Sequence, residues 1–366
     1  MQLSSALRNL SFSLALIVAT AAEARLPSSV RHVIEARVAE TGFSGAVMVS
    51  AHGRTSYVGA FGFAERAFDT PVRTDTRFPV ASITKLFTAV LLLQLVDEGR
   101  VRLDAPLATY LPSYPGGGGD RVTVRQLLNH TSGVAQFDTV ASYQEAFANG
   151  VANYQRPLTP EALLNACCNG QLDSQAGAAF NYNNADYFIL GRIIEHVTGM
   201  TYEDVLRARI LVPLQLLDTG MMRWDAITPR LASTYFYRDD RQILIRDMPV
   251  YWENFYAAGG MYSTTADLAA FAEAVYGAQL ISPTSLSELL TPGQDEYGLG
   301  LWSYSFARHG QTYRVAKRPG SIMGANSVLY RLLDQEITIV LLANTNRADL
   351  DVFAQRLAEA LIDAER

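Results

Sequence analysis

A serine and a lysine three residues apart are the first residues in this sequence whose types and spacing could do chemistry. Ser82 and Lys85 stand at the start of an apolar segment that ends at Gly99. Residues three apart on a helix share a face, so a helix would place the Lys85 amine beside the Ser82 hydroxyl. A serine hydroxyl becomes an effective nucleophile when a neighbouring base takes its proton. A lysine buried among apolar side chains has its pKa lowered and can be that base, or can tune another one. The pair predicts a nucleophilic serine, although the same spacing also occurs by chance in unrelated helices.

The use of lysine in this chain supports a chemical role for Lys85. Of the 30 lysine and arginine residues, only Lys85 and Lys317 are lysines. Arginine does not release its proton in a protein, so a position that needs a neutral amine must keep lysine. The alternative, a lysine left on a buried helix without a task, is unfavourable because burying an unpaired charge is costly.

A second polar segment, residues 180–184, carries Tyr182 and Asn184 just ahead of a predicted helix. In an extended segment these two side chains point the same way. A tyrosine beside an ammonium group can ionise more easily and shuttle a proton, and an asparagine amide can bind a substrate carbonyl or amide. The alternative is a polar loop that caps the helix.

A third polar segment, Lys317-Arg318-Pro319-Gly320-Ser321, precedes a strand that begins near residue 325. Paired cations beside a glycine suggest an anion or carboxylate site, because glycine lets the backbone come close to a ligand. Neighbouring strand residues face opposite ways, so only one of the two cations should look into a cleft. The alternative is a solvated basic turn.

The elements around these residues predict an α+β fold. Residues 45–50 and 55–62 predict a β-hairpin, and residues 82–98 a helix that is apolar on nearly every face and therefore buried. Residues 105–295 are mainly helical in pattern, with the clearest helices at 124–129, 160–168, 184–198 and 202–211. Strands are expected at 298–304, 325–332 and 337–343, and a last helix at 350–364.

These elements imply an antiparallel β-sheet flanked by helices, built from both chain ends, with a mainly helical insertion. We expect residues 25–80 and 296–366 to form the sheet domain and residues 81–295 the helical domain. The active site would lie at their interface.

The first 24 residues have the features of a secretory signal peptide. Arg8 is followed by an apolar run over residues 10–22 and then by Ala22-Glu23-Ala24, a small-x-small cleavage site. The run is shorter than the ~20 apolar residues that a membrane span requires, so no stable membrane anchor is expected. We predict cleavage after Ala24 and a periplasmic or secreted protein.

Composition excludes several other classes of function. A net charge of −6 argues against nucleic acid or an anionic membrane as partner. The five histidines are scattered, without metal-ligand spacing, so we expect no metal and no cofactor. The only cysteines, Cys167 and Cys168, are adjacent, and we expect that they do not bridge, because such a bridge would be strained.

In their order along the chain, Ser82-x-x-Lys85, Tyr182-x-Asn184 and Arg318-x-Gly320 resemble the three motifs of serine β-lactamase-like enzymes. This superfamily includes class C β-lactamases, D-alanyl-D-alanine carboxypeptidases, D-aminopeptidases and related esterases. Residues 127–133, 258–264 and 297–300 also look like its recurring segments, so the resemblance covers most of the chain after the signal peptide.

The resemblance implies a mechanism and assigns roles. Ser82 would attack a carbonyl carbon while Lys85 and Tyr182 move its proton, and Asn184 would hold the substrate. Backbone N–H groups of Ser82 and Ser321 would form the oxyanion hole, each donor typically worth ~3 kcal/mol. Water would then release the acyl group. His130 lies in a recurring segment but at no catalytic position, and we interpret it as structural.

The third motif departs from the pattern of the superfamily. It usually begins with lysine, histidine or tryptophan, and in β-lactamases a hydroxyl residue follows. Here Arg318 comes first and Pro319 second, so the hydroxyl that helps to grip a β-lactam carboxylate is absent. Arg318 could still bind a carboxylate bidentately. We predict an exported serine hydrolase of the esterase or D-amino-acid peptidase type, acting on a small molecule or peptide with an ester, amide or β-lactam carbonyl.

Other interpretations stay open at this point. One is a β-lactamase proper, and another is a non-catalytic penicillin-binding or sensor domain that acylates without hydrolysis or not at all. A Ser-His-Asp α/β-hydrolase is not supported, because no Gly-x-Ser-x-Gly occurs in the chain. The sequence does not reveal the acyl group, the leaving group, the choice between hydrolysis and acyl transfer, or the oligomeric state.

Overall fold

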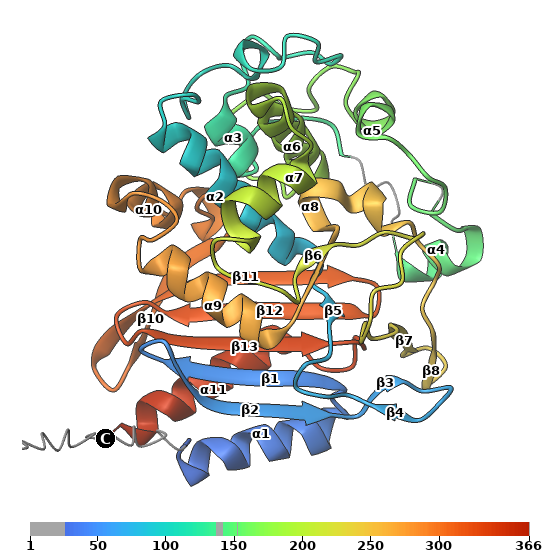
Figure 1. Ribbon diagram of the computed structural model, residues 1–366, viewed down its shortest axis with the longest axis vertical. Helices are drawn as coiled ribbons and strands as arrows, with labels where there is room; N and C mark the ends of the chain where they lie inside the picture. The colour runs from blue at the N-terminus through green and yellow to red at the C-terminus, as the bar shows by residue number, and fades with distance from the viewer. Residues whose placement is uncertain (1–25, 137–141, 152, 366) are drawn as a thin grey trace, which may run out of the picture.

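The computed structural model describes residues 26–136, 142–151 and 153–365, so the predicted signal peptide lies outside the described residues. Its centre is a six-stranded antiparallel sheet of order β10-β11-β12-β13-β1-β2 (Figure 1). The N-terminal part of the chain supplies β1 (Gly45–Ala51) and β2 (Arg54–Phe61). The C-terminal part supplies the other four, β10 (Trp302–Arg308), β11 (Gln311–Ile322), β12 (Ala325–Leu332) and β13 (Ile337–Ala343).

The two ends of the chain meet where β1 pairs with β13, with Gly45 opposite Ala343 and Ala51 opposite Ile337. All residues of β13 are buried, as is expected of a strand with helices on both faces of its sheet. The prediction of an antiparallel sheet built from both chain ends, in an α+β fold, is confirmed.

Helices from both chain ends cover one face of the sheet. There, α1 (Ser28–Thr41) packs against α11 (Leu350–Ala364), and α11 packs on β12 and β13. Phe353 of α11 meets Phe43 edge to face, with the ring centroids 5.6 Å apart. On the other face, α9 (Thr265–Tyr276) packs on β13 and β1 (Figure 1).

The helical half is organised around α2 (Thr84–Asp97). Eleven of its 14 residues are buried, in agreement with a helix that is apolar on nearly every face. Phe87 of α2 stacks on Phe271 of α9 with the ring centroids 3.7 Å apart. The other helices of this half are α3 (Val124–Leu128), α4 (Tyr143–Asn149), α5 (Pro160–Cys167), α6 (Asn184–Thr198), α7 (Tyr202–Leu206), α8 (Tyr256–Gly259) and α10 (Pro283–Leu290).

Short strands connect the two halves. Central among them is β9 (Met261–Ser263), which pairs with β5 (Phe78–Pro79) on one side and β6 (Gly220–Met221) on the other. Two hairpins, β3 (Phe63–Glu65) with β4 (Thr70–Pro71) and β7 (Tyr235–Arg238) with β8 (Ile243–Arg246), lie at one end of the main sheet (Figure 1). The division into two domains at residues 80 and 296 stays a prediction.

Several predicted boundaries differ from the structure. The helix expected from Ser82 begins at Thr84, because Ala81–Ile83 form a separate 3₁₀ turn. The strand expected at 298–304 lies at Trp302–Arg308, because Gly300 has a positive φ of 92° that interrupts an extended chain. Helix α1 was not predicted. Its buried residues are only Val30, Ile34 and Arg37, too few for a clear helical pattern.

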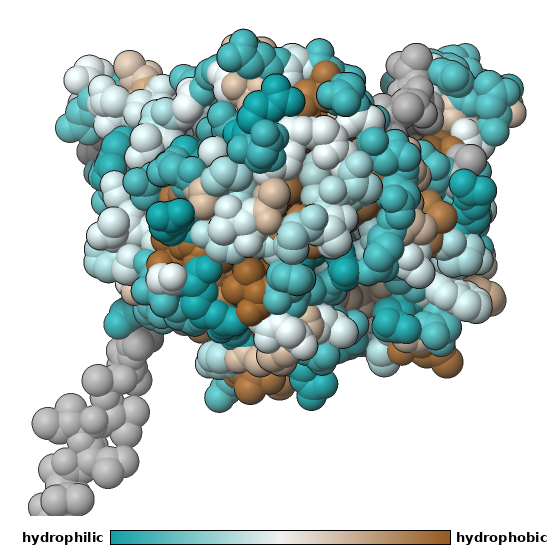
Figure 2. Space-filling view, turned by 90° about the horizontal axis from the view of Figure 1, so that it is seen from above, coloured by the Kyte–Doolittle hydropathy of each residue, from teal (hydrophilic) through white to brown (hydrophobic). Residues whose placement is uncertain are grey.

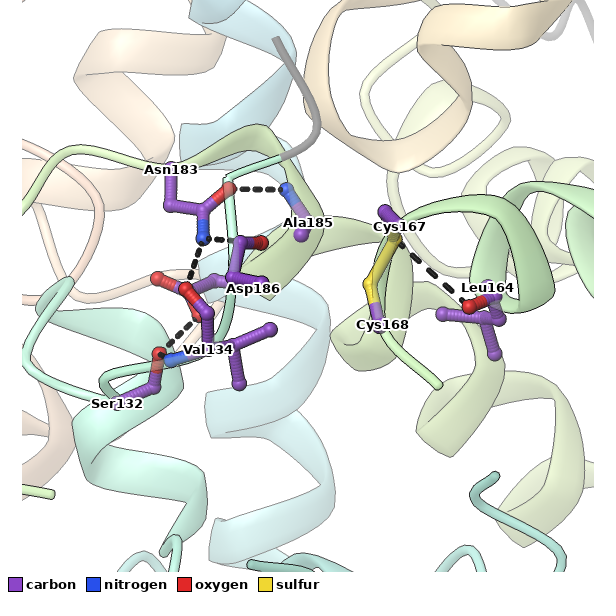
Figure 3. The surroundings of a disulfide bond; sticks show 9 residues. Ser132, Val134, Leu164, Cys167, Cys168, Asn183, Ala185 and Asp186 are labelled. Carbon is purple, nitrogen blue, oxygen red and sulfur yellow. Dashed lines mark hydrogen bonds between the residues drawn. A yellow bond between two sulfur atoms is a disulfide. The ribbon is translucent and has the colours of Figure 1, made fainter. Parts of the chain in front are cut away.

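The prediction that Cys167 and Cys168 do not bridge is wrong. The structure joins them by a disulfide bond at the end of α5 (Figure 3). Cys167 is the last residue of the helix, and Cys168 leaves helical geometry with φ −128° and ψ 16°. The end of the helix therefore gives the backbone the freedom that a bridge between neighbours needs.

The outer surface gives two further findings. Seen from above, the molecule is mostly hydrophilic or neutral, and its apolar side chains form separate patches (Figure 2). No helix in the described part of the chain has the length and apolar character of a membrane span.

Candidate active site

Ser82 lies in a tight turn between β5 and α2, where the sheet half meets the helical half. Two hydrogen bonds fix the start of this turn, from Val80 N–H to the Met261 carbonyl and from Ile83 N–H to the Val80 carbonyl. Ala81, directly before the serine, has φ +46°, a left-handed conformation that is costly for a residue with a Cβ. The turn presents a half-buried Ser82 side chain at the wall of a cavity.

Lys85, in the first turn of α2, brings a fully buried amine to Ser82. Its Nζ donates to Ser82 Oγ at 3.1 Å, Asn184 Oδ1 at 2.7 Å and the Ala258 carbonyl at 2.9 Å. These three oxygens match the three donors of an ammonium group. The contacts therefore favour a charged Lys85 that tunes the base Tyr182, and not the neutral amine that the use of lysine suggests. The sequence pattern thus places the amine beside the hydroxyl, as the spacing of three residues predicts.

Tyr182 approaches Ser82 from the segment that enters α6. Asn183 begins this helix by accepting the N–H of Ala185, and Gln136 Nε2 donates to the Tyr182 carbonyl at 2.7 Å. The Tyr182 Oη is 2.9 Å from Ser82 Oγ. Its ring stacks on Trp302 with the centroids 6.1 Å apart. The phenol is therefore held by backbone contacts on one side and by an indole ring on the other.

Arg318 of β11 lies against the same phenol. Its guanidinium donates from Nη2 to Tyr182 Oη at 2.5 Å, from Nη1 to Tyr297 Oη at 2.6 Å and from Nε to the Ser82 carbonyl at 2.7 Å. Arg318 is 1% exposed. Lys317 lies on the opposite face of the strand, where its Nζ is 3.2 Å from Asp351 of α11. Of the two adjacent cations, only Arg318 belongs to this site.

The charges around Tyr182 change its acidity. Burial raises the pKa of the phenol, but the positive charges of Arg318 and Lys85 outweigh burial and lower the pKa to about 8. A tyrosine in water has a pKa of about 10. The Tyr182 phenolate is therefore accessible close to neutral pH, and its oxygen already contacts the hydroxyl of Ser82.

Gly320 lets β11 come close to the Ser82 turn. β10 begins opposite Lys317, so in the described part of the chain residues 318–322 pair only with β12, and the turn lies against the open edge. A Cβ on Gly320 would lie 2.4 Å from the Val80 carbonyl and 2.8 Å from Ser82 N, which is closer than any side chain allows. Proline has no N–H to donate to a neighbouring strand. Pro319 is tolerated here because no further strand pairs with this edge of β11.

The cavity in front of Ser82 has a volume of about 420 Å³. The lining residues come from the Ser82 turn, β10, β11, β12 and the start of α11, and include Ser82, Tyr182, Trp302, Arg318, Gly320 and Ser321. Six of the seven predicted site residues thus lie together. Five of them line the cavity, and the sixth, Lys85, lies directly beside Ser82. Asn184 contacts Lys85 and does not line the cavity among the described residues.

Sequence reasoning missed two aromatic residues of the site. Tyr297 accepts from Arg318, and Trp302 lines the cavity beside Tyr182. Both lie in or next to residues 297–300, which look like a recurring segment of the superfamily. This likeness could have indicated that the segment belongs to the site. It could not indicate the contact with Arg318, which is a tertiary one.

His130 is buried beneath the site, as part of a neutral pair with Asp186. Nδ1 of His130 accepts the N–H of Asn183 at 3.3 Å and is 2.9 Å from Asp186 Oδ2. The pair is neutral when Asp186 keeps its proton and the His130 ring carries one, and the pKa shifts of both groups favour that state. Burial raises the pKa of Asp186 well above its usual value, and burial, aided by the Lys85 and Arg318 charges, lowers the pKa of His130.

The pair supports Tyr182 from below. The His130 ring lies 4.5 Å from the Tyr182 ring and 5.0 Å from the Tyr297 ring. Ser132 Oγ donates to Asp186 and accepts the N–H of Val134; Figure 3 shows this corner of the structure beside the disulfide. These contacts agree with the interpretation of His130 as a structural residue.

Comparison with known proteins identifies the family. Residues 30–364 match the family described as Beta-lactamase. The chain belongs to this family. The match spans both halves of the fold and all three sequence motifs, so the β-lactamase/transpeptidase-like superfamily that the motifs resemble is the correct one.

Members of the β-lactamase family that resemble this chain differ in their activities. Esterase EstB of Burkholderia gladioli is 27% identical over 304 residues, 76% of each chain. Penicillin-binding protein 4* of Bacillus subtilis is 26% identical over 324 residues, 82% of this chain and 68% of the relative. The crystal structure of a D-stereospecific amidohydrolase from Streptomyces sp. is 30% identical with a TM-score of 0.76, covering 91% of this chain and 97% of that one.

Asp186→Asn tests the neutral pair. The amide keeps the shape and the hydrogen bonds of a protonated carboxyl, so we expect the free energy of unfolding at pH 7 to change by less than about 1 kcal/mol. Asp186→Ala leaves Ser132 and His130 without their buried partner and should cost roughly 2–4 kcal/mol. Urea unfolding measures both. Equal damage from the two substitutions would mean that the carboxyl is ionised and needed as a charge.

Gly320→Ala tests the close approach of β11 to the Ser82 turn. The added Cβ must push the strand away from Ser82, and a shift of about 1 Å at a reacting group can cost ~100-fold in rate. We expect kcat/KM for a p-nitrophenyl ester to fall by at least ~100-fold. Gly170→Ala is the control, because nothing lies within 4 Å of its Cβ. Wild-type activity in Gly320→Ala would contradict the assigned geometry.

Proposed function

We propose that this protein is an exported serine hydrolase that forms an acyl-enzyme at Ser82 and hydrolyses an ester or an amide. One observation carries the proposal: the Ser82 hydroxyl is in hydrogen-bond contact with both the Lys85 amine and a Tyr182 phenol of lowered pKa, at the wall of a cavity. The esterase and the amidohydrolase among the relatives support an ester or amide as the substrate.

In the acylation step, Ser82 Oγ attacks the carbonyl carbon of the substrate and passes its proton to the Tyr182 phenolate. Lys85 donates to the same Oγ and, with Arg318, holds the phenolate in the ionised state. The tetrahedral oxyanion is stabilised by the N–H groups of Ser82 and Ser321, which lie on the two segments that Gly320 brings together. Tyr182 then gives the proton to the leaving oxygen or nitrogen as its bond to carbon breaks.

In the deacylation step, water replaces the leaving group and loses a proton to Tyr182 as it attacks the acyl carbon. The ester bond to Ser82 breaks, and the proton returns to Ser82 Oγ. Asn184 acts in this proposal through Lys85, because its Oδ1 orients the amine. The substrate-holding role that the second motif implies for Asn184 would require the substrate to reach beyond the residues that line the cavity. The reaction needs no cofactor.

The place of action is also a proposal. Residues 1–24 have the pattern of a signal peptide, which would direct the chain to the periplasm or the medium. The site at the junction of the sheet half and the helical half would then meet substrates outside the cytoplasm.

Ser82→Ala tests the nucleophile. We would incubate the purified protein with penicillin, a p-nitrophenyl ester and a D-Ala-D-Ala peptide, and follow intact mass and turnover. Wild type should gain a covalent adduct or turn over at least one substrate, and Ser82→Ala should lose the adduct and at least ~10³-fold in kcat.

The exposed Ser305 on β10 offers a matched control, since Ser305→Ala removes the same oxygen away from the cavity. It should behave as wild type. Equal turnover in Ser82→Ala and wild type would contradict the proposal. A wild type with neither adduct nor turnover on any of the three substrates would favour a non-catalytic domain.

A further inference from the structure

The contacts of Arg318 define its role more closely than its position in the third motif does. A guanidinium that receives a substrate carboxylate must offer two neighbouring N–H groups to the solvent-filled cavity. Arg318 is 1% exposed, and each of its three nitrogens already donates to an oxygen of the protein. These bonds use three of the five N–H groups of the guanidinium, which leaves one on each terminal nitrogen. At 1% exposure these two N–H groups offer a carboxylate almost no surface, so it could reach them only if the side chains around Arg318 moved.

Aromatic rings close off the guanidinium. Its central carbon is 5.5 Å from the Tyr182 ring centroid, 5.9 Å from that of Tyr297 and 5.5 Å from that of Trp302. Cations over ring faces are stabilised by the ring quadrupole, so these contacts also favour the buried position. The side chain is thus held by three hydrogen bonds and three rings.

The other charges at the cavity do not favour a carboxylate either. Among the lining residues that the structure describes, Arg318 is the one cation, whereas Asp349 and Asp351 are acidic. Lys317 lies on the opposite face of β11 and pairs with Asp351. Pro319 brings no hydroxyl next to Arg318.

We propose that Arg318 is a positioning residue, which fixes Ser82 and Tyr182, and that the site consequently takes esters or amides with no carboxylate beside the scissile bond. This inference rests on the proposed function and names its substrate class. The rigid, planar guanidinium of Arg318 donates to both the backbone carbonyl of Ser82 and the phenol oxygen of Tyr182. It thereby sets the distance between these two residues. It also supplies positive charge to the Tyr182 phenolate.

Two esters that differ only in charge test the proposal. In one, N-acetyl-D-alanine is esterified to lactate, whose carboxylate lies next to the scissile bond; in the other it is esterified to the neutral lactamide. We expect wild-type kcat/KM to be at least tenfold higher for the lactamide ester. A preference for the lactate ester would overturn the proposal.

Variants separate positioning from substrate binding. Arg318→Gln should lower kcat/KM for both esters by the same factor, so their ratio stays unchanged. It should also move the acid limb of the pH profile to higher pH, because loss of the cation raises the pKa of Tyr182. Lys317→Gln, which removes the neighbouring cation on the other face, should leave activity and profile unchanged. A loss confined to the lactate ester would contradict the role of Arg318.

The proposal can also be tested without turnover, by measuring how the two esters bind to a variant that cannot be acylated. Calorimetry with Ser82→Ala should show that the lactate ester binds no tighter than the lactamide ester. Tighter binding of the lactate ester by tenfold or more, lost in Ser82→Ala/Arg318→Gln, would overturn the proposal. Failure of the proposed function has a different signature, since wild type would then hydrolyse neither ester while these affinities stay as expected.

Discussion

The structure around Ser82 depends on the burial of two cations. Lys85 is 0% exposed and Arg318 is 1% exposed, and a buried charge without partners costs several kcal/mol or more. Each cation is therefore surrounded by oxygens: Lys85 by Ser82, Asn184 and Ala258, Arg318 by Ser82, Tyr182 and Tyr297. The oxygens that make burial tolerable include the hydroxyl and the phenol that we propose to do the chemistry.

Each half of the fold contributes one cation. Lys85 comes from α2, the buried helix of the helical half, and Arg318 from the open edge of β11 in the sheet half. Gly320 allows the two halves to close, because β11 can come near the Ser82 turn only where no Cβ intervenes. Tyr182 lies between the cations, above the neutral pair of His130 and Asp186. Neutrality of that pair matters, since a further charge beneath the phenol would alter its acidity.

The sequence predicted the features that depend on residues close together along the chain, and missed those that depend on contacts between distant segments. The contact of Lys85 with Ser82 follows from helical spacing, and the α+β sheet from strand patterns at both chain ends. The contacts of Arg318 are tertiary: they require the open edge of β11, the rings of Tyr297 and Trp302, and the turn at Ala81. The bridge between Cys167 and Cys168 depends on where α5 ends, which the sequence pattern did not resolve.

The most direct test of this account is a titration of the phenolate absorbance in wild type and in Tyr182→Phe. The chain has 18 tyrosines, and a tyrosine without special neighbours ionises near pH 10. Two buried cations beside Tyr182 predict that one tyrosine ionises near pH 8 and that this step is absent from Tyr182→Phe. If no tyrosine ionised below its ordinary range, or if the early step persisted in Tyr182→Phe, the cations would not hold Tyr182 as the base.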